Sequence, residues 1–458
     1  MITPPAGFRA LPLSITQLSL AAVLQCGQSF RWNIFPLLSL ASGTSGADNL
    51  HPTHEYRLCL RDRVVCLRQS LDTLFYRSVL PGPPLSRTLQ DEREAETLAW
   101  LRDYFQLDVD LEALYEQWGK RDSVFMNRQQ RFSGIRVLRQ DPFENLISFI
   151  CSSNNNIARI TKMVKALCRQ YSPALIALPS PALTDDDSND PSTQELTEAY
   201  HPFPPPSALA APEVASTLRG LGFGYRAEFI QRTAQMLVEA HGVAASESGV
   251  EPAEKWLHSL RKMSTSDARE ELLKFVGVGR KVADCVLLMS LDKREVIPVD
   301  THVHQIAMKH YGVSGSSKAK SNMTPKLYDE VSSKLAAVWG DYAGWAHLVL
   351  FTSDLKSFSS YGLSTTAAFP KAQPDVKITS RQRKSVLATP SATPSPAGKR
   401  KRKQVQEATV AIIANEKVES SSTQHSDVEL PALDDSSMAD RVKRRRRVKV
   451  TIAAVALK

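Results

Sequence analysis

The hydrophobic pattern of the N-terminal part of the chain predicts a mixed region of strands and helices over residues 1–135. Two short apolar runs, Tyr56–Leu60 and Val64–Leu67, are separated by three polar residues, which is typical of an antiparallel hairpin. Apolar residues recur at helical spacing in Glu92–Phe105 and predict an amphipathic helix. The leucines of Leu11–Leu24 also have helical spacing and predict a further helix.

From residue 136 to residue 368 the pattern is mostly helical, which predicts a second domain. Pro142 stands at the expected start of a strongly apolar helix, because proline fits the first turn of a helix, and Ile157–Tyr171 predicts another. Residues 180–206 are acidic and rich in proline, so we expect a disordered insertion there. Residues 36–54 are rich in Ser, Gly and Ala and predict a loop insertion in the N-terminal domain.

The C-terminal residues 369–458 show no hydrophobic periodicity and are expected to form a disordered basic tail. Lys371 and the residues after it include 19 Lys and Arg and 9 Asp and Glu, a net charge of +10, so residues 1–370 carry about −1 of the total of +9. The basicity therefore describes the tail and not the folded part. Two clusters, Lys399–Lys403 and Lys443–Arg447, predict nuclear import or nucleic-acid contact.

Composition narrows the classes of protein to which the chain can belong. No run approaches the roughly 20 apolar residues of a membrane helix, and residues 1–18 lack the pattern of a secretory or transit peptide. The cysteines are scattered without a C-x-x-C pair, which predicts reduced thiols in an intracellular protein, with no zinc or iron–sulfur site and no cofactor. The six are Cys26, Cys59, Cys66, Cys151, Cys168 and Cys285.

One stretch of the helical region carries a pattern with chemical meaning. A helix is expected to end in a tight turn in which Gly277 and Gly279 flank one small apolar residue, and the apolar run Val282–Leu291 predicts a buried second helix. Free backbone N–H groups at the start of a helix bind anions such as a DNA phosphate. Lys281 stands at this helix start, and Asp300 follows nineteen positions later.

Lys281 has two interpretations when it is considered alone. A lysine just after a phosphate-binding turn can serve as a phosphate clamp. It also stands at the border of a buried helix, where removal from water favours the neutral amine that acts as a nucleophile. Asp300 is near enough in sequence to share a site with it, which favours the second interpretation.

The helix, turn, helix, Lys281 and Asp300 together resemble the helix-hairpin-helix DNA glycosylases that carry an amine nucleophile. Four further stretches in the expected order are similar to the eukaryotic 8-oxoguanine DNA glycosylase/AP lyases: Cys26–Trp32, Cys151–Arg159, Gly222–Arg226 and Ala343–Ala346. The resemblance covers most of residues 7–360. Since no cysteine follows the hairpin helix, the iron–sulfur branch of the superfamily, including the adenine-removing enzymes, is disfavoured.

The resemblance implies a mechanism for the two central residues. In the bifunctional members, the lysine attacks the sugar C1′, the base departs and a Schiff base forms, which then permits β-elimination of the 3′ phosphate. The matching aspartate supports the developing oxocarbenium charge and orients the amine. These roles fall on Lys281 and Asp300.

The resemblance also implies a base pocket. The backbone carbonyl of Gly27 would accept the hydrogen that oxidation adds to N7 of guanine, although the glycine could simply end the preceding helix. Cys285 and Phe351 would sandwich the purine with Met289 on the wall, and each could equally be ordinary core. His347 stands where better-known relatives have a glutamine against the base edge. We therefore expect base selectivity to vary with pH near neutrality.

Further residues would hold the duplex after the damaged base is flipped out of the stack. By resemblance, Asn154 fills the hole, Arg159 and Arg226 read the orphaned cytosine, Tyr225 wedges beside it and His302 contacts a phosphate. The alternatives are a helix cap or turn for Asn154, a surface charge for Arg226 and core packing for Tyr225.

The sequence thus predicts an α+β fold, with an N-terminal antiparallel sheet module packed on a helical helix-hairpin-helix region. The expected substrate is double-stranded DNA containing 8-oxoguanine opposite cytosine, acted on by a nuclear monomer. A glycosylase for another lesion, such as an alkylated purine, typically lacks an amine nucleophile, so Lys281 argues against it. A non-catalytic DNA-binding protein would be expected to lose Lys281 or Asp300, and both are present.

Overall fold

The computed structural model of the chain describes residues 3–37, 51–181, 197–244, 249–313 and 323–363. The expected tail, 369–458, and most of the expected loop at 36–54 lie outside the described residues. Within the described part, no helix is both long enough and apolar enough to cross a lipid bilayer.

A five-stranded antiparallel sheet forms the N-terminal part, in the order β1-β5-β4-β3-β2. The strands, with a separate pair β6 and β7, are β1 (Arg9–Pro12), β2 (Asn33–Pro36), β3 (His54–Cys59), β4 (Val64–Gln69), β5 (Thr73–Val79), β6 (Ile176–Pro179) and β7 (Thr197–Tyr200). The predicted hairpin is confirmed as β3 and β4, with Tyr56 opposite Leu67.

The helix predicted over Leu11–Leu24 is wrong. Residues 9–12 form an edge strand that pairs with β5, and the helix is limited to the short Leu20–Val23. Helical spacing of leucines is a local signal, whereas the pairing with β5 comes from a segment some sixty residues away in the chain. Pairing with β5 therefore determines that residues 9–12 form a strand.

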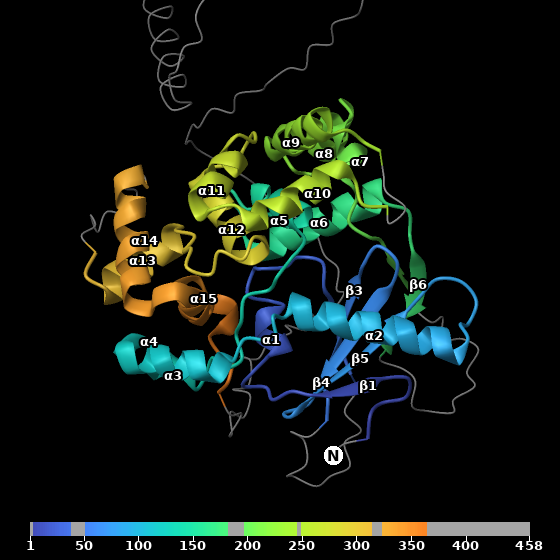
Figure 1. The fold of residues 1–458 in the computed structure, drawn as a ribbon, viewed down its shortest axis with the longest axis horizontal. Coiled ribbons are helices and arrows are strands. Elements are labelled where there is room, and N and C mark those ends of the chain that lie inside the picture. Colours follow the sequence, from blue (N-terminus) through green and yellow to red (C-terminus); the bar gives the residue numbers. More distant parts are fainter. Residues whose placement is uncertain (1–2, 38–50, 182–196, 245–248, 314–322, 364–458) are drawn as a thin grey trace, which may run out of the picture. The chain divides into compact units, whose positions relative to one another are not determined.

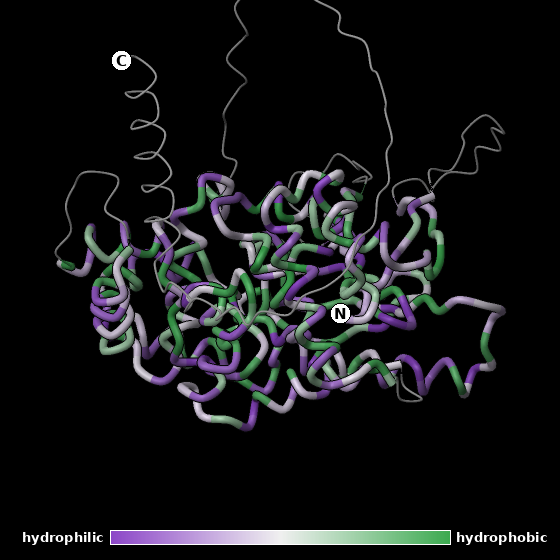
Figure 2. Tube along the Cα trace, turned by 90° about the horizontal axis from the view of Figure 1, so that it is seen from above, coloured by the Kyte–Doolittle hydropathy of each residue, from purple (hydrophilic) through white to green (hydrophobic). Residues whose placement is uncertain are grey.

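Helices make up most of the remaining described chain. They are α1 (Leu20–Val23), α2 (Arg87–Tyr104), α3 (Leu111–Arg121), α4 (Ser123–Gln129), α5 (Pro142–Ile150), α6 (Ile157–Tyr171), α7 (Pro206–Ala210), α8 (Val214–Gly220), α9 (Arg226–His241), α10 (Pro252–Ser259), α11 (Thr265–Leu273), α12 (Arg280–Ser290), α13 (Thr301–His310), α14 (Pro325–Trp339) and α15 (Ala343–Asp354). Hydrophobic and hydrophilic residues are interspersed at short range along the trace (Figure 2), as expected when elements bury one face and expose the other.

The predicted disordered insertion at 180–206 needs correction. Residues 182–196 lie outside the described residues, but the remainder contains β7, which pairs with β6 in an antiparallel register. Tyr200 at the end of β7 is buried, and its hydroxyl accepts a hydrogen bond from Arg57 Nη1 of the main sheet at 3.4 Å. Burial of an aromatic side chain offsets the cost of ordering this short strand.

Two of the three buried clusters in the described part of the chain are large and organise the fold. One lies between the sheet and α2, which crosses the sheet in Figure 1 and contributes Leu101 and Tyr104, and Phe105 follows directly after this helix. The larger lies among the helices, with α5 packed on α12 near its centre. Helices α3 and α4 add Trp118 and Phe125 to this larger core, although they precede the predicted boundary at residue 135. That boundary stays a prediction, while the α+β class is confirmed.

A buried ion pair joins the sheet part to the helical part. Arg31, just before β2, donates from Nε and Nη2 to the carboxylate of Glu144 on α5, at 2.8 and 2.6 Å. Its remaining nitrogen, Nη1, donates to the carbonyl of Cys59 at 2.7 Å. The guanidinium therefore binds β3 and α5 at the same time.

All six cysteines are free and buried, as the sequence predicted. Burial raises the pKa of every one of these thiols, to about 11 for Cys285. At neutral pH the thiols are therefore almost entirely protonated.

Candidate active site

The predicted hairpin is present as α11, a turn and α12, and it rests on α9. Gly277 has a φ of +83°, and a Cβ at this position would lie 2.4 Å from the ring of Phe229 on α9. Thr233, also on α9, donates to the carbonyl of Val276 at 3.1 Å. Gly279 is the N-cap of α12, with open space where a side chain would be. Only Gly277 thus needs to be glycine for steric reasons.

Lys281 lies in the first turn of α12 and is partly buried. Its Nζ donates to Ser152 Oγ at 3.2 Å and lies 4.8 Å from the centre of the Phe149 ring. Phe149 belongs to α5, and Ser152 follows directly after that helix. The amine thus lies between the aromatic face of Phe149 and the hydroxyl of Ser152, at the edge of the buried core of the helical part.

Asp300 is the N-cap of α13, and this position fixes its carboxylate. Oδ1 accepts hydrogen bonds from the backbone N–H groups of His302 and Val303, both at 2.9 Å. Oδ2 makes no hydrogen bond with any residue that the structure describes. One oxygen anchors the side chain while the other is available to a ligand.

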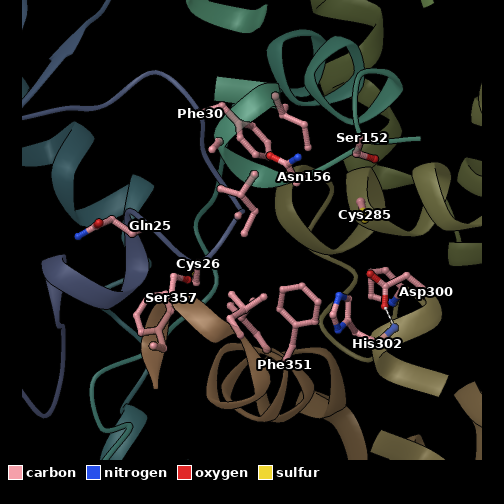
Figure 3. Close-up of a pocket in the computed structure, with 18 of the residues that line it drawn as sticks. Gln25, Cys26, Phe30, Ser152, Asn156, Cys285, Asp300, His302, Phe351 and Ser357 are labelled. Atoms are coloured by element: carbon pink, nitrogen blue, oxygen red, sulfur yellow. Dashed lines mark hydrogen bonds between the residues drawn. The ribbon is translucent and has the colours of Figure 1, made fainter. Parts of the chain in front are cut away.

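A cavity of about 900 Å³ brings most of the predicted site together. Its walls come from the loop after α1, the end of α5, α12, the start of α13 and α15 (Figure 3). The predicted residues that line it are Gly27, Lys281, Cys285, Met289, Asp300, His302, His347 and Phe351. The expected nucleophile Lys281, the carboxylate of Asp300 and the expected base pocket therefore share one cavity.

Phe351 lies between two histidines in the cavity wall. Its ring centre is 6.1 Å from that of His302 and 6.0 Å from that of His347. His302 Nδ1 is 3.8 Å from the carboxylate of Asp354, one turn along α15. His302 meets the Phe351 ring edge-on at 89°, and His347 is tilted from it by 37°, so the three rings form an aromatic wall that is not flat.

His347 is 6% exposed, and neither ring nitrogen makes a hydrogen bond within the described structure. Burial lowers the pKa of His347 to about 4, against the opposing charge of Asp300. The Gly344 carbonyl also raises the pKa, but without the geometry of a hydrogen bond. The ring of the free protein is therefore neutral near pH 7, which argues against the expected pH dependence of base selectivity near neutrality.

Gly27 lies in the turn after α1 with a φ of +91°. A Cβ would come within 2.9 Å of Ile157 Cδ1, at the start of α6. Both the backbone conformation and the close contact require glycine here. Its backbone consequently reaches the cavity wall without a side chain in the way.

The loop after α5 places Asn154 on the surface, in a left-handed conformation with a φ of +47°. The N-cap of α6 is Asn156, whose side chain accepts from the N–H of Arg159 at 3.0 Å, so the cap interpretation of Asn154 is wrong. A second cavity, of about 730 Å³, joins Asn154 to Gly279, Lys281, Asp300 and His302.

The alternative interpretations of Arg226 as a surface charge and of Tyr225 as a core residue are both wrong. Arg226 is 3% exposed and not a surface charge: its Nη2 donates to the carbonyls of Ser153 and Asn154. Tyr225 is 51% exposed and not core, with its hydroxyl donating to Ser153 O at 3.2 Å. Arg159 is exposed and donates to Gly222 O at 3.2 Å. Tyr225 and Arg226 thus contact the loop that carries Asn154, and Arg159 contacts the turn before α9.

Sequence reasoning missed two residues that touch the amine. Ser152 and Phe149 contact Lys281, but nothing in a single sequence distinguishes them from a helix end and a core aromatic. The one available signal was the position of Ser152 beside the asparagine run.

Comparisons with known proteins agree with this geometry. Residues 10–146 match the family described as 8-oxoguanine DNA glycosylase, N-terminal domain, and residues 147–330 match the HhH-GPD superfamily base excision DNA repair proteins. An N-glycosylase/DNA lyase of Saccharomyces cerevisiae is 34% identical over 384 residues, which are 81% of this chain and 91% of the yeast protein. An N-glycosylase/DNA lyase of Arabidopsis thaliana is 35% identical over 75% of this chain and 80% of its own.

A solved structure has the same fold. The 8-oxoguanine glycosylase/lyase of Clostridium acetobutylicum superposes with a TM-score of 0.55 at 22% identity, over 77% of this chain and 98% of the bacterial one. The yeast relative is matched over 91% of its length and the plant relative over 80%, and the two matched families adjoin within α5, between residues 146 and 147. The chain belongs to the 8-oxoguanine DNA glycosylase family of N-glycosylase/DNA lyases, within the helix-hairpin-helix superfamily.

Proposed function

We propose that this enzyme excises 8-oxoguanine paired with cytosine from duplex DNA through a lysine Schiff base, and then nicks the strand. The observation that carries the proposal is the position of Lys281 and Asp300 in the wall of one cavity, together with the expected base-binding residues. A solved structure of the Clostridium relative contains double-stranded DNA with cytosine opposite 8-oxoguanine, which supports the same substrate here.

The reaction begins with the amine of Lys281. Its lone pair attacks C1′ of the flipped nucleotide, the C1′–N9 bond breaks, and the base leaves with the bonding electrons and takes up a proton. The sugar ring then opens to a Schiff base between C1′ and Nζ. Loss of a C2′ proton expels the 3′ phosphate, which nicks the strand. Asp300 Oδ2 lies free to stabilise positive charge on the sugar.

The cavity supplies the groups that distinguish the damaged base. The Gly27 carbonyl would accept the N7 hydrogen that guanine lacks, and loss of such a bond costs roughly 1–3 kcal/mol. Cys285 and Phe351 would hold the ring between them, with Met289 on the wall. His347, neutral and without a hydrogen-bond partner in the described structure, would offer one donor and one acceptor to the base edge.

The surface around the second cavity would hold the duplex. Asn154 would fill the space left by the flipped base, with Tyr225 beside it and Arg159 on the cytosine. Arg226 would have to release the carbonyls of its loop before it could contact a base.

The DNA backbone would meet the hairpin at its anion-binding turn. Gly277 and Gly279 would present N–H groups to one phosphate, and His302 would contact another. We infer that the enzyme acts as a monomer. Action in the nucleus is supported by the two basic clusters of the tail.

Trapping of the covalent intermediate tests the mechanism. The protein is incubated with an 8-oxoguanine:cytosine duplex and borohydride, which reduces a Schiff base to a stable amine. We expect a protein–DNA adduct that requires both the lesion and Lys281. Lys281→Gln and an undamaged guanine duplex should each give none.

Two results would contradict the proposal. Release of free base without an adduct would mean that water, not Lys281, displaces the base. Neither base release nor adduct would mean that the chain binds DNA without acting on it.

A further inference from the structure

A buried hydrogen-bond chain links α12 to the segment before Asp300, and its tyrosine, Tyr328, lies in the wall of the second cavity beside Lys281 and Asp300. Asp284, one turn after Lys281, is 1% exposed. Its Oδ1 accepts from Arg269 Nε of α11 at 2.7 Å, and its Oδ2 accepts from the hydroxyl of Tyr328 on α14 at 2.7 Å. A buried carboxylate with these two partners is firmly held within the core.

The hydroxyl of Tyr328 has a second bond that reaches the other catalytic element. It accepts from the backbone N–H of Val299 at 3.0 Å, and Val299 directly precedes Asp300. Tyr328 is 4% exposed, and its ring also contacts the guanidinium of Arg280 at 4.7 Å. Burial, reinforced by the charge of Asp284, raises the pKa of Tyr328, so the phenol stays protonated and donates to the carboxylate.

The segment before Asp300 depends on this contact because it has no regular secondary structure. Residues 296–300 lie between the end of α12 and the start of α13 and take no part in a strand. The Val299 N–H therefore has no ladder or helix partner, and the Tyr328 hydroxyl supplies one. Two hydrogen bonds of the Tyr328 hydroxyl therefore connect the two catalytic residues. One goes to Asp284, on the same helix as Lys281, and the other comes from Val299, the residue before Asp300.

We propose that Tyr328 is a positioning residue that fixes the separation between the amine of Lys281 and the carboxylate of Asp300. The inference rests on the proposed function, since it assumes that these two groups act together. A displacement of the carboxylate by a fraction of an ångström weakens transition-state stabilisation but leaves the duplex-binding surface around Asn154 unchanged.

The test is Tyr328→Phe, which keeps the ring and its contact with Arg280 and removes only the hydroxyl. We expect the single-turnover rate of base excision to fall about tenfold or more, with an unchanged Kd for the lesion duplex. Tyr311→Phe is the matched control, because Tyr311 also donates to a partly buried aspartate, Asp122, at 2.6 Å, away from Val299. It should lose comparable stability but keep the wild-type rate.

A double-mutant comparison shows whether Tyr328 acts through Asp300. In an Asp300→Asn background, Tyr328→Phe should reduce the rate no further, because the carboxylate that it positions is already gone. Wild-type rates for Tyr328→Phe, an equal loss for Tyr311→Phe, or the same additional loss in both backgrounds would each overturn the inference.

The two proposals fail differently. Lys281→Gln decides the mechanism by the presence or absence of the trapped adduct, whatever Tyr328 does. Unfolding midpoints of all variants, measured alongside, identify any loss of rate that comes from loss of the folded state.

Discussion

The imidazole of His347 illustrates how one buried side chain acquires a chemical role. Each unpaired polar atom inside a protein costs roughly 1–3 kcal/mol, and His347 has two of them. A ligand that supplies partners on the two sides of the ring would remove this cost, because one nitrogen of the neutral imidazole donates and the other accepts. Because burial keeps the ring neutral, the preference for such a ligand should be constant between about pH 6.5 and 8.

His347 also makes folding stability depend on pH. Its pKa falls from 6.5 to about 4 on folding, so between these values the unfolded chain binds a proton that the folded chain does not. Protonation of His347 therefore does not lower the free energy of unfolding above pH 6.5. As the pH falls toward 4, it lowers that free energy by on the order of 3 kcal/mol. Urea unfolding at several pH values should show that His347→Gln lacks this part of the acid sensitivity. Parallel curves for the two proteins would contradict it.

Which residues could be predicted depended on how local their signal was. Lys281 and Asp300 could be predicted from local features of the sequence. These are the glycine turn, the start of the helix after it and the nineteen-residue spacing between the two side chains. Arg226 is different, since its burial arises only when the loop at Ser153 folds against α9. The same holds for Ser152 and Phe149, whose roles appear only when α12 packs on α5.

At the level of elements, the two glycines of the hairpin turn have different structural roles. Gly277 combines a positive φ with close contact to Phe229, whose ring in turn lies 5.6 Å from that of Tyr225. The turn of the hairpin and Tyr225, the proposed wedge residue, are therefore both in contact with one phenylalanine. Gly279 has ordinary backbone geometry, and a side chain there meets only open space.

The same substitution at the two glycines should change the free energy of unfolding by different amounts. Gly277→Ser should lower the free energy of unfolding by about 1–3 kcal/mol, from left-handed strain and collision with Phe229. Gly279→Ser should change it by less than about 0.5 kcal/mol, because serine is a good helix cap and the space is open. Chemical denaturation of both variants decides this. Equal losses would mean that the contact with Phe229 is unimportant.

Elements with local signals were predicted closely and the others were not. The helix Ile157–Tyr171 was predicted to the residue, since an asparagine cap precedes it and Ser172 follows it. The strand Arg9–Pro12 was missed, because its only reason to be a strand is β5, and β5 itself was not predicted. Pairing between distant segments leaves little trace in either segment alone.

At the scale of the molecule, the sheet part and the helical part are joined by the Arg31–Glu144 pair. Both side chains are largely removed from water, and the guanidinium also binds the carbonyl of Cys59. A buried pair of this kind resists separation because a lone buried charge is costly. The cavity has walls from both parts, so this junction also preserves its shape.

Arg31→Ala should therefore destabilise the protein by about 3 kcal/mol, since Glu144 is left buried without its partner. Arg9→Ala, which breaks the exposed pair with Asp91, should cost less than about 1 kcal/mol. Thermal unfolding of the two variants provides the comparison. If Arg31→Ala were as mild as Arg9→Ala, the junction would depend on apolar packing alone.

The six buried thiols have a consequence for the conditions under which such an enzyme works. Guanine is oxidised when hydrogen peroxide and related species are abundant, and these oxidants attack exposed thiolates first. A repair enzyme with a sensitive thiol would be inactivated by the same exposure that creates its substrate. Because all six cysteine thiols are buried and protonated, we expect them to react slowly with these oxidants, so that the protein keeps working during the exposure that makes it necessary.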